Sequence, residues 1–506
     1  MPKPYAEPMR LLLAFAAGAL VPLSFSPVDL WPVALLSTAV LYVLLADAGP
    51  RRAALIGWSF GFGLFGVGAS WVYVSIHDFG NAPPALAGVL TFLFVVGLGL
   101  FLALQTWLYR RLGAAKHPVL GFAATWALGE WFRSWFLTGF PWLYLGYAHV
   151  TTPLAGIAPL FGVIGISFVL ALSSALSGEC FLRYRKLASA RALLSSHLPT
   201  LLVVLWAAAM MPRNIAWTQA TGSLDVGLVQ ANIPQDLKFD PGARARNLDT
   251  YLKLSAPLWD KDLVIWSETA VPAVYAAEAP IVAELSALAD SRGATLLTGI
   301  FGRTDDNTHN SAVVLGDGTG LWHKQKLVPF GEYVPLRALS AGLLELFELP
   351  MSSIVPGPAG QDLLAVAQHS VAPFICYEIV YPDFVRRYAR DADLLVTISN
   401  DTWFGSSWGP HQHMQMSAMR ALENGRWLAR ATNNGVSALV NERGVIVAQA
   451  PQFEETTLSG TVQLMSGRTP WSRWGNWPLL ILCALLLLAN FQEMPGSITG
   501  KNNKNR

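Results

Sequence analysis

Three ionisable residues in the second half of the chain each follow a short apolar run and precede turn-forming residues. Glu268 lies in "LVIWSETAVP", Lys324 in "LWHKQKLVPFGEYVP" and Cys376 in "FICYEIVYP". A nucleophilic thiol needs a base to take its proton, and a cation or hydrogen-bond donor to stabilise the oxyanion that forms on the attacked carbonyl. The three stretches contain one residue of each kind. We therefore interpret Glu268 as the base, Lys324 as the cation and Cys376 as the nucleophile.

Each of these residues also has a structural interpretation. A glutamate at a strand end often caps or forms an ion pair, a lone lysine is usually a solvated charge, and a lone cysteine usually packs in a core. The three cysteines, at 180, 376 and 483, show no even pairing and no C-x-x-C spacing, which argues against a disulfide framework and a zinc site. The "HQH" at 411–413 has no third ligand in view, so it predicts packing in a loop or at a helix start and no metal.

The composition indicates that much of the chain is surrounded by lipid. Hydrophobic residues make up 53% and charged residues 13%, against about a quarter charged in soluble domains. The formal charge of +2 gives no reason to expect a nucleic acid partner. Eight apolar segments come near the ~20 residues of a spanning helix. They are 9–26, 30–48, 53–75, 84–109, 118–137, 157–178, 196–212 and 474–492.

Basic residues predict the orientation of these segments, because cytoplasmic loops retain Lys and Arg. Alternate connections are basic, while the short loops between them, such as "SIHDFGNAPP", contain neither Lys nor Arg. Both termini are therefore expected in the cytoplasm, and the region between the seventh and eighth segments outside. The basic residues are Lys3, Arg10, Arg51, Arg52, Arg110, Arg111, Lys116, Arg183, Arg185, Lys186, Arg191, Lys501, Lys504 and Arg506.

The external region, 220–466, has the alternation of short apolar runs and helical stretches that is typical of a globular α/β domain. Short, mostly unalternated apolar runs such as "DLVIWSE", "ATLLTGIFG" and "DLLVTISN" predict strands buried on both faces of a sheet. Stretches 245–260 and 412–432 are expected to be helical. The chain is thus divided into a seven-helix membrane region (1–213), a catalytic domain (220–466), an eighth helix (474–492) and a polar tail (493–506).

In type and order, the three residues resemble the Glu-Lys-Cys triad of the nitrilase superfamily. The stretches "KQKLVPFGE" and "ICYEIVYPD" carry that likeness, and "WVYVSIHDFG", "GFPWLYLGY", "LVQANIPQDLK", "SNDTWFG" and "TNNGVSALVN" extend it to the membrane-bound apolipoprotein N-acyltransferase family. The resemblance implies an αββα sandwich, attached to an eight-helix transmembrane bundle and located on the periplasmic side of the bacterial inner membrane.

The resemblance also implies a two-step acyl transfer without a cofactor. Cys376 would take an acyl chain from a membrane phospholipid, typically phosphatidylethanolamine, as a thioester. The α-amine of the S-diacylglyceryl-cysteine at an apolipoprotein's N-terminus would then receive it. Lys324 would favour the thiolate, and Glu268 would accept the thiol proton and return it to the leaving alkoxide.

Family correspondence adds Glu332, Tyr377 and Glu378 to the site. Glu332 would position Lys324 or the thioester, or merely close an ion pair, and the backbone N–H of Tyr377 is a candidate oxyanion donor. Two residues depart from the family pattern. Phe239 occupies a position where relatives often have Trp, so this position keeps an aromatic platform but has no indole. Lys326 occupies a position where many relatives have His.

Two further features are open to more than one interpretation. The apolar stretch 336–358 could pack into the domain, but its position favours a flap at the lipid interface in which Leu343, Leu344 and Phe347 gate lipid entry. Glu130 and Arg133 lie three residues apart on one predicted helix face, where they can pair. We favour a structural role for this pair over a functional one.

Two other classes of function remain open. A membrane-tethered amidase would use the same residues with water as acceptor, although one span would suffice to tether it. A transporter or scaffold would place polar residues or broken helices near mid-membrane. Here the ionisable cluster lies outside the spans, which favours the acyltransferase.

Overall fold

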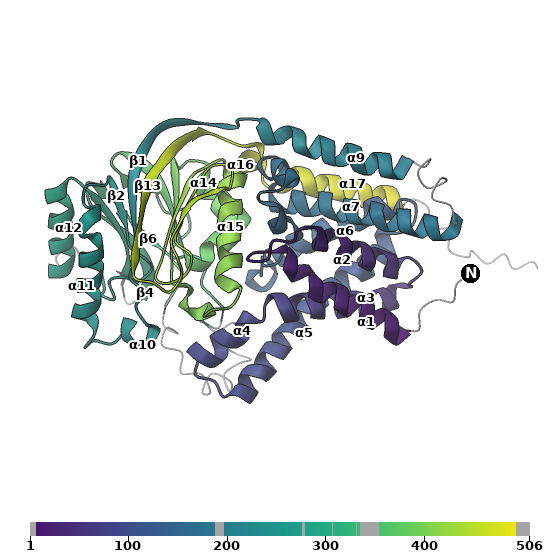
Figure 1. Ribbon diagram of the computed structural model, residues 1–506, viewed down its shortest axis with the longest axis horizontal. Helices are drawn as coiled ribbons and strands as arrows, with labels where there is room; N and C mark the ends of the chain where they lie inside the picture. The colour runs from purple at the N-terminus through teal and green to yellow at the C-terminus, as the bar shows by residue number, and fades with distance from the viewer. Residues whose placement is uncertain are drawn as a thin grey trace, which may run out of the picture.

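The computed structural model describes residues 7–187, 197–275, 279–305, 307–329, 331–333 and 354–491. Figure 1 shows a helical part beside a part built on two β-sheets, and the last helix returns to lie among the early ones. Asn490 Oδ1 accepts a hydrogen bond from the backbone N–H of His117 at 2.7 Å, which fastens the chain's last described helix to the region before the sheets.

Each of the eight expected apolar segments contains a helix. By length and composition, three of the described helical segments could cross a membrane, or four if the bent pair Pro50–Gly68 and Trp71–Phe79 forms one span. Eight spans therefore remain a prediction. The main helices of this part are α1 (Glu7–Leu20), α2 (Pro32–Leu45), α3 (Pro50–Gly68), α4 (Trp71–Val74), α5 (Pro84–Leu108), α6 (Pro118–Arg133), α7 (Ala158–Leu187), α9 (His197–Met210), α16 (Pro470–Trp474) and α17 (Trp477–Phe491).

Prolines and glycines explain how several of these helices begin and meet. Helices α2, α3, α5 and α6 each start at a proline, whose fixed φ and missing N–H suit the first helical turn. Where α1 meets α3, a Cβ added to Gly18 would lie 1.9 Å from the carbonyl oxygen of Phe60. The close approach of these two helices therefore requires glycine at position 18.

The sheets form the centre of the other part. One has the order β13-β1-β2-β3-β4-β6, and the other β12-β11-β10-β9-β8-β7-β5. Their strands are β1 (Thr218–Gln230), β2 (Leu263–Ile265), β3 (Thr295–Thr304), β4 (Asn307–Gly316), β5 (Gly318–Thr319), β6 (Leu321–His323), β7 (Leu364–Val366), β8 (His369–Ile375), β9 (Leu394–Ser399), β10 (Leu428–Thr432), β11 (Ala438–Val440), β12 (Ile446–Gln449) and β13 (Thr456–Gly467).

Alternating side chains explain why these strands are apolar on both faces. In β2, Leu263 and Ile265 join the large core shared with strands of the second sheet, whereas Val264 joins a smaller core with Tyr251 and Leu285. The smaller core lies under helices α11 (Arg244–Ser255) and α12 (Pro280–Arg292). The prediction of strands buried on both faces is confirmed.

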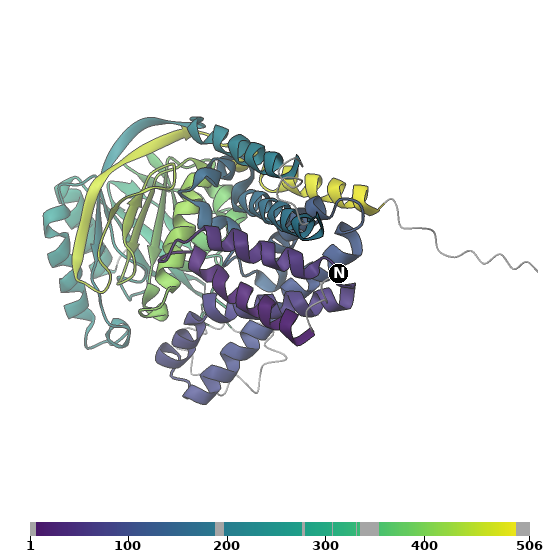
Figure 2. The same cartoon turned by 45° about the vertical axis from the view of Figure 1, so that its right-hand side comes forward.

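The layers follow the order helix, sheet, sheet, helix, as expected of an αββα sandwich. Figure 1 shows α11 and α12 outside the first sheet, and α14 (Pro382–Ala389) and α15 (Gly409–Asn424) between the second sheet and the helical part. Figure 2 shows the long pair β1 and β13 arching from the helical part over the sheets. Because β1 follows α9 and β13 precedes α16, both connections between the two parts leave along this pair.

One local prediction was wrong. Residues 412–432 were expected to be helical throughout, but α15 ends at Asn424 and β10 occupies Leu428–Thr432. Gly425 adopts a left-handed conformation with φ 61°, and its N–H bonds to the carbonyl of Ala421. This glycine cap stops the helix, and the following residues pair in parallel with β9.

Candidate active site

The three residues with candidate chemistry all follow strands. Glu268 comes three residues after β2, Lys324 directly after β6, and Cys376 directly after β8. Cys376 has φ 51°, a left-handed backbone conformation that is rare for a residue with a side chain. Such strain costs about 1–3 kcal/mol and occurs mainly where the surrounding structure fixes a functional residue.

A buried ion cluster joins Glu268, Lys324 and Glu332. Lys324 Nζ lies 2.8 Å from Glu332 Oε1 and 3.3 Å from Glu268 Oε1, and the lysine is only 1% exposed. Asn310 Nδ2 donates to Glu268 Oε1 at 2.7 Å and to Glu332 Oε1 at 3.2 Å. Lysine, both carboxylates and the amide are thus almost fully buried and hold one another in position.

Cys376 belongs to the same electrostatic cluster. Burial and then the Glu268 carboxylate raise the pKa of its thiol to about 12, against the opposing charge of Lys324. Burial also opposes the charge of Glu268, but Lys324 and Lys238 outweigh it and lower that carboxyl's pKa. The thiol is therefore protonated at neutral pH beside an ionised carboxylate. Lys324 acts in the expected direction and lowers the pKa of the thiol, but burial and the Glu268 charge outweigh it in this resting arrangement, so the base is needed.

Glu378 connects the loop that follows Lys324 to the turn that begins at Cys376, here called the cysteine turn. Its Oε1 accepts from the backbone N–H groups of Gln325 at 2.6 Å and Lys326 at 3.2 Å, and its Oε2 accepts from that of Ile375 at 2.9 Å. Burial raises the pKa of Glu378 to about 7, and these amide donors oppose the rise. One carboxylate therefore aligns the backbone before Cys376 with the backbone after Lys324.

Tyr377 connects the cysteine turn to the helical part. Its ring stacks on Trp142 with a centroid distance of 6.5 Å and an interplanar angle of 17°, and Trp142 Nε1 donates to Gln412 Oε1 at 2.6 Å. Trp142 lies between α6 and α7, so residues of the helical part contact the residue that follows the nucleophile.

The pairing expected for Glu130 and Arg133 takes another form. Glu130 Oε1 accepts from the backbone N–H of Leu145 at 3.0 Å, and Arg133 donates to the carbonyl of Trp142 at 2.6 Å. Arg133 also lies over the ring of Tyr144 at 4.8 Å. Both charged side chains hold the segment that carries Trp142, which is a structural role of the kind favoured from the sequence.

Sequence reasoning missed several residues around the triad. Lys238 Nζ donates to the backbone carbonyl of Glu268 at 2.7 Å, and the backbone N–H of Asn400 donates to Glu268 Oε2 at 2.8 Å. Asn310, described above, is a third. The available signal was a polar residue inside or directly after a buried strand, as in "HNSAVV" and "TISND".

His413 was interpreted as packing in a loop or at a helix start, and it lies in the first turns of α15. The structure adds that its Nε2 lies 3.2 Å from the carbonyl oxygen of Cys376, and its Nδ1 3.0 Å from Asp401 Oδ1. Since a carbonyl only accepts, Nε2 carries the proton. Among the described residues, no group of three His, Cys, Asp or Glu could hold a metal ion.

The expected substrate-binding residues are less well defined. Phe239 lies with its ring 6.4 Å from that of Phe301 and has no hydrogen bond or ring contact with the triad among the described residues. Leu343, Leu344 and Phe347, expected to gate lipid entry, lie outside the described residues, as does most of 336–358.

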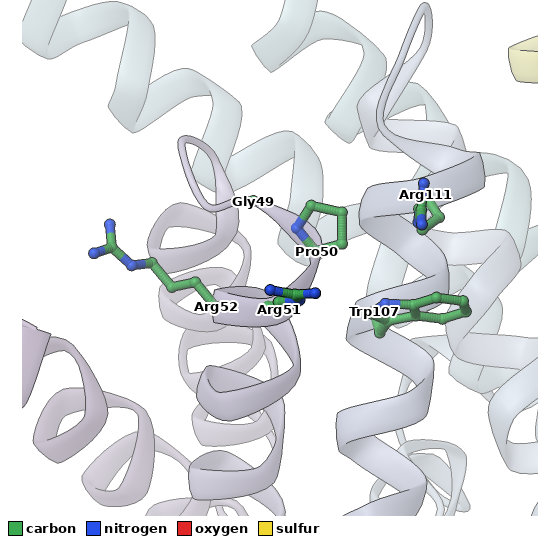
Figure 3. Close-up of a pocket in the computed structure, with 6 residues that line it drawn as sticks. All are labelled: Gly49, Pro50, Arg51, Arg52, Trp107 and Arg111. Carbon is green, nitrogen blue, oxygen red and sulfur yellow. The ribbon is translucent and has the colours of Figure 1, made fainter.

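A separate pocket of about 520 Å³ opens at the junction of α3 and α5. Figure 3 shows its lining side chains, with Arg51 and Arg52 on one helix and Trp107 and Arg111 on the other. The guanidinium of Arg111 lies 5.6 Å from the Trp107 ring centroid. Arg52 pairs with Glu7 at the start of α1, which Figure 1 places at the end of the helical part away from the sheets. This pocket is therefore remote from Cys376.

Two family models match this chain. Residues 225–469 match the carbon-nitrogen hydrolase model, and residues 17–176 match the apolipoprotein N-acyltransferase N-terminal domain model. A solved carbon-nitrogen hydrolase superfamily protein from Xanthomonas campestris aligns over 51% of this chain and 96% of its own, with 20% identity and a TM-score of 0.38. The family match assigns residues 225–469 to a carbon-nitrogen hydrolase domain.

Relatives that align over nearly their whole length show to which family the whole chain belongs. The apolipoprotein N-acyltransferase of Azotobacter vinelandii is 49% identical over 94% of this chain and 93% of its own length. That of Coxiella burnetii is 38% identical over 96% of this chain and 100% of its own. The chain belongs to the apolipoprotein N-acyltransferase family, whose members are membrane enzymes that transfer acyl groups.

Proposed function

We propose that this enzyme moves an acyl chain from a membrane phospholipid to the α-amino group of the N-terminal S-diacylglyceryl-cysteine of apolipoproteins. The observation that carries the proposal is the buried cluster of Glu268, Lys324 and Glu332 beside Cys376, whose φ of 51° turns it out of β8. Phosphatidylethanolamine is the donor we favour, and no cofactor is needed because conversion of an ester to an amide is downhill.

In the first step, the Cys376 sulfur attacks the ester carbonyl while the thiol proton passes to Glu268. Lys324 and the backbone N–H of Tyr377 stabilise the oxyanion. Collapse breaks the bond to the glycerol oxygen, which takes the proton back from Glu268 and leaves as a lysophospholipid. The acyl chain remains on Cys376 as a thioester.

In the second step, the lipoprotein's neutral amine attacks the thioester carbonyl. Glu268 takes the proton that the nitrogen loses and returns it to the departing sulfur, which restores the thiol. Because one pocket serves two bulky lipid substrates in turn, the kinetics are ping-pong. Glu332 orients Lys324, and Glu378 aligns the loops that carry Lys324 and Cys376.

The proposed location is the bacterial inner membrane, with eight spans, both termini in the cytoplasm, and the catalytic domain, about 220–466, in the periplasm. Figure 3 shows Arg51, Arg52 and Arg111 around one pocket. Arg52 pairs with Glu7 at the start of α1, which lies at the end of the helical part away from the sheets (Figure 1), and this supports the orientation. A protease added outside spheroplasts should cut within the catalytic domain and leave a tag at either terminus intact.

The function is tested with purified enzyme, phosphatidylethanolamine and a synthetic S-diacylglyceryl-cysteinyl peptide. The expected products are a peptide heavier by one acyl chain on its α-amine and an equal amount of lysophospholipid, both absent with C376A. Free fatty acid with unmodified peptide would instead indicate a hydrolase. Peptide binding without any product would indicate a scaffold.

A further inference from the structure

Lys238 is a buried ammonium that has no role in the proposed triad. It ends the short helix α10 (Gln235–Lys238) and is 4% exposed. Its Nζ donates to the backbone carbonyl of Glu268 at 2.7 Å. A lysine is almost never fully buried unless it is paired, because removing its charge from water is costly. A hydrogen bond to one neutral carbonyl does not explain why this position carries a cation.

The surrounding backbone holds Lys238 in place. Asn247 Nδ2 donates to the carbonyl of the preceding residue, Leu237, at 2.8 Å. The Gln235 side chain accepts from Asn400 Nδ2 at 2.8 Å. Asn400 in turn donates its backbone N–H to Glu268 Oε2. The helix that carries Lys238 is thus fastened on one side to α11 and on the other to the loop that bonds the proposed base.

The charges of the buried cluster balance only when Lys238 is counted. Glu268 and Glu332 are two carboxylates, and Lys324 alone would leave them with one uncompensated negative charge. When the thiol proton moves to Glu268 and an oxyanion forms on the substrate, the negative charges are the oxyanion and Glu332. Two ammonium groups again balance them. Lys238 therefore keeps the cluster neutral both before and during the reaction.

The other charged groups nearby are compensated by different partners. Asp401, which acts on Cys376, forms an ion pair with Arg430 at 2.7 Å and bonds to His413. Glu378 accepts three backbone N–H groups. Neither group supplies the positive charge that Glu268 and Glu332 still need.

We propose that Lys238 is a positioning residue of the active centre: it fixes the main chain of Glu268 and supplies a second positive charge that favours ionisation of Cys376 and Glu268. The inference rests on the proposed function for the roles of those two residues. Burial lowers the pKa of Lys238 to about 8, with Glu268 and Cys376 opposing that fall. The ammonium thus persists at neutral pH.

The test measures how fast iodoacetamide alkylates Cys376 between pH 7 and 10, quantified on the Cys376 peptide by mass spectrometry. The variants are K238M, the neutral hydrogen-bond donor K238Q, and the charge-retaining K238R. K253Q, at an exposed lysine of α11, is the matched control. Only samples with a cooperative melting transition are compared, and K238Q stands in if K238M does not fold.

Since only the thiolate reacts, loss of a nearby cation should slow alkylation about tenfold at pH 7 in K238M and K238Q, and this difference should shrink as the pH rises through the Lys238 pKa of about 8. K238R and K253Q should match the wild type. A purely structural role predicts the reverse, because a loosened site exposes the thiol and speeds its reaction. Unchanged or faster alkylation at pH 7 in K238M and K238Q would overturn the inference.

This readout needs no acyl transfer, so it separates the two proposals. If the wild type forms no thioester, the proposed function fails whatever the alkylation rates are. If the wild type forms the thioester and K238Q alkylates at the wild-type rate at pH 7, only the role of Lys238 fails.

Discussion

Lys324 lies closer to Glu332 than to Glu268, with its Nζ 2.8 Å from Glu332 Oε1 and 3.3 Å from Glu268 Oε1. Glu332 also accepts the backbone N–H of Val328 through its other oxygen, at 2.8 Å. Glu332 is therefore the residue that fixes the ammonium, while Glu268 shares it. This division lets Glu268 change its protonation state without releasing Lys324.

E332Q should slow thioester formation and destabilise the domain. Without this carboxylate, Lys324 pairs with Glu268 alone, which makes Glu268 a weaker base. Breaking a buried ion pair by removing one partner costs about 3 kcal/mol. The measurements are the rate of lysophospholipid release and the melting temperature in detergent. E284Q, at an exposed glutamate of α12, is the control and should change neither. A stable but fully active E332Q would contradict this role.

E268Q should affect acyl transfer and alkylation in opposite directions. Loss of the general base should slow transfer by about 10²–10⁴-fold. The Glu268 charge raises the pKa of Cys376, so its removal should lower that pKa and speed alkylation by iodoacetamide at pH 7–8. Both rates are measured on the same preparation. If both fell together, Glu268 would have only a structural role.

The stability difference between the wild type and E378Q should depend on pH. Burial raises the pKa of Glu378 from its ordinary value of 4.5 to about 7. The folded state therefore binds more protons than the unfolded state between those values, and wild-type stability falls as pH rises through that window. E378Q cannot titrate there. The stability that E378Q loses relative to the wild type should be largest near pH 4.5 and smallest above pH 7, as measured by melting temperatures. A deficit that is constant across this range would refute the assignment.

R133M should slow acyl transfer, although Arg133 reaches the active centre only through Trp142 and Tyr377. Arg133 donates to the carbonyl of Trp142, whose ring stacks on Tyr377. Loss of a buried charged hydrogen bond costs about 1.5–3 kcal/mol. We expect a lower melting temperature and slower thioester formation, since the segment beside the cysteine turn loosens. R111M, at an exposed arginine of the remote pocket, is the control. Wild-type kinetics in R133M would show that this contact does not reach the active centre.

Residue types at strand ends carried most of the predictive information about the site. Glu268, Lys324 and Cys376 each follow an apolar run, and Glu332 is near in sequence to Lys324, so their meeting at one end of the sandwich could be expected. Their roles remain proposals. Lys238 and His413 could not be foreseen, because each reaches the triad through a long-range contact from a short helix or a helix start.

Helix and strand ends were harder to predict than their existence. Most residues of the segment 412–432 suit a helix, but Gly425 interrupts them, and its left-handed conformation shows where α15 stops. The eight apolar segments predicted helices correctly. Hydropathy alone does not say which of them cross the membrane, because α2 and α17 are apolar but shorter than 18 residues.

The most direct test of the account is the intact mass of the enzyme after incubation with phosphatidylethanolamine alone, without any lipoprotein. We predict an increase of one acyl chain, carried on the Cys376 peptide, removed by hydroxylamine and absent in C376A. An unchanged mass in the wild type, or the same adduct in C376A, would contradict a thioester on Cys376 as the intermediate of acyl transfer.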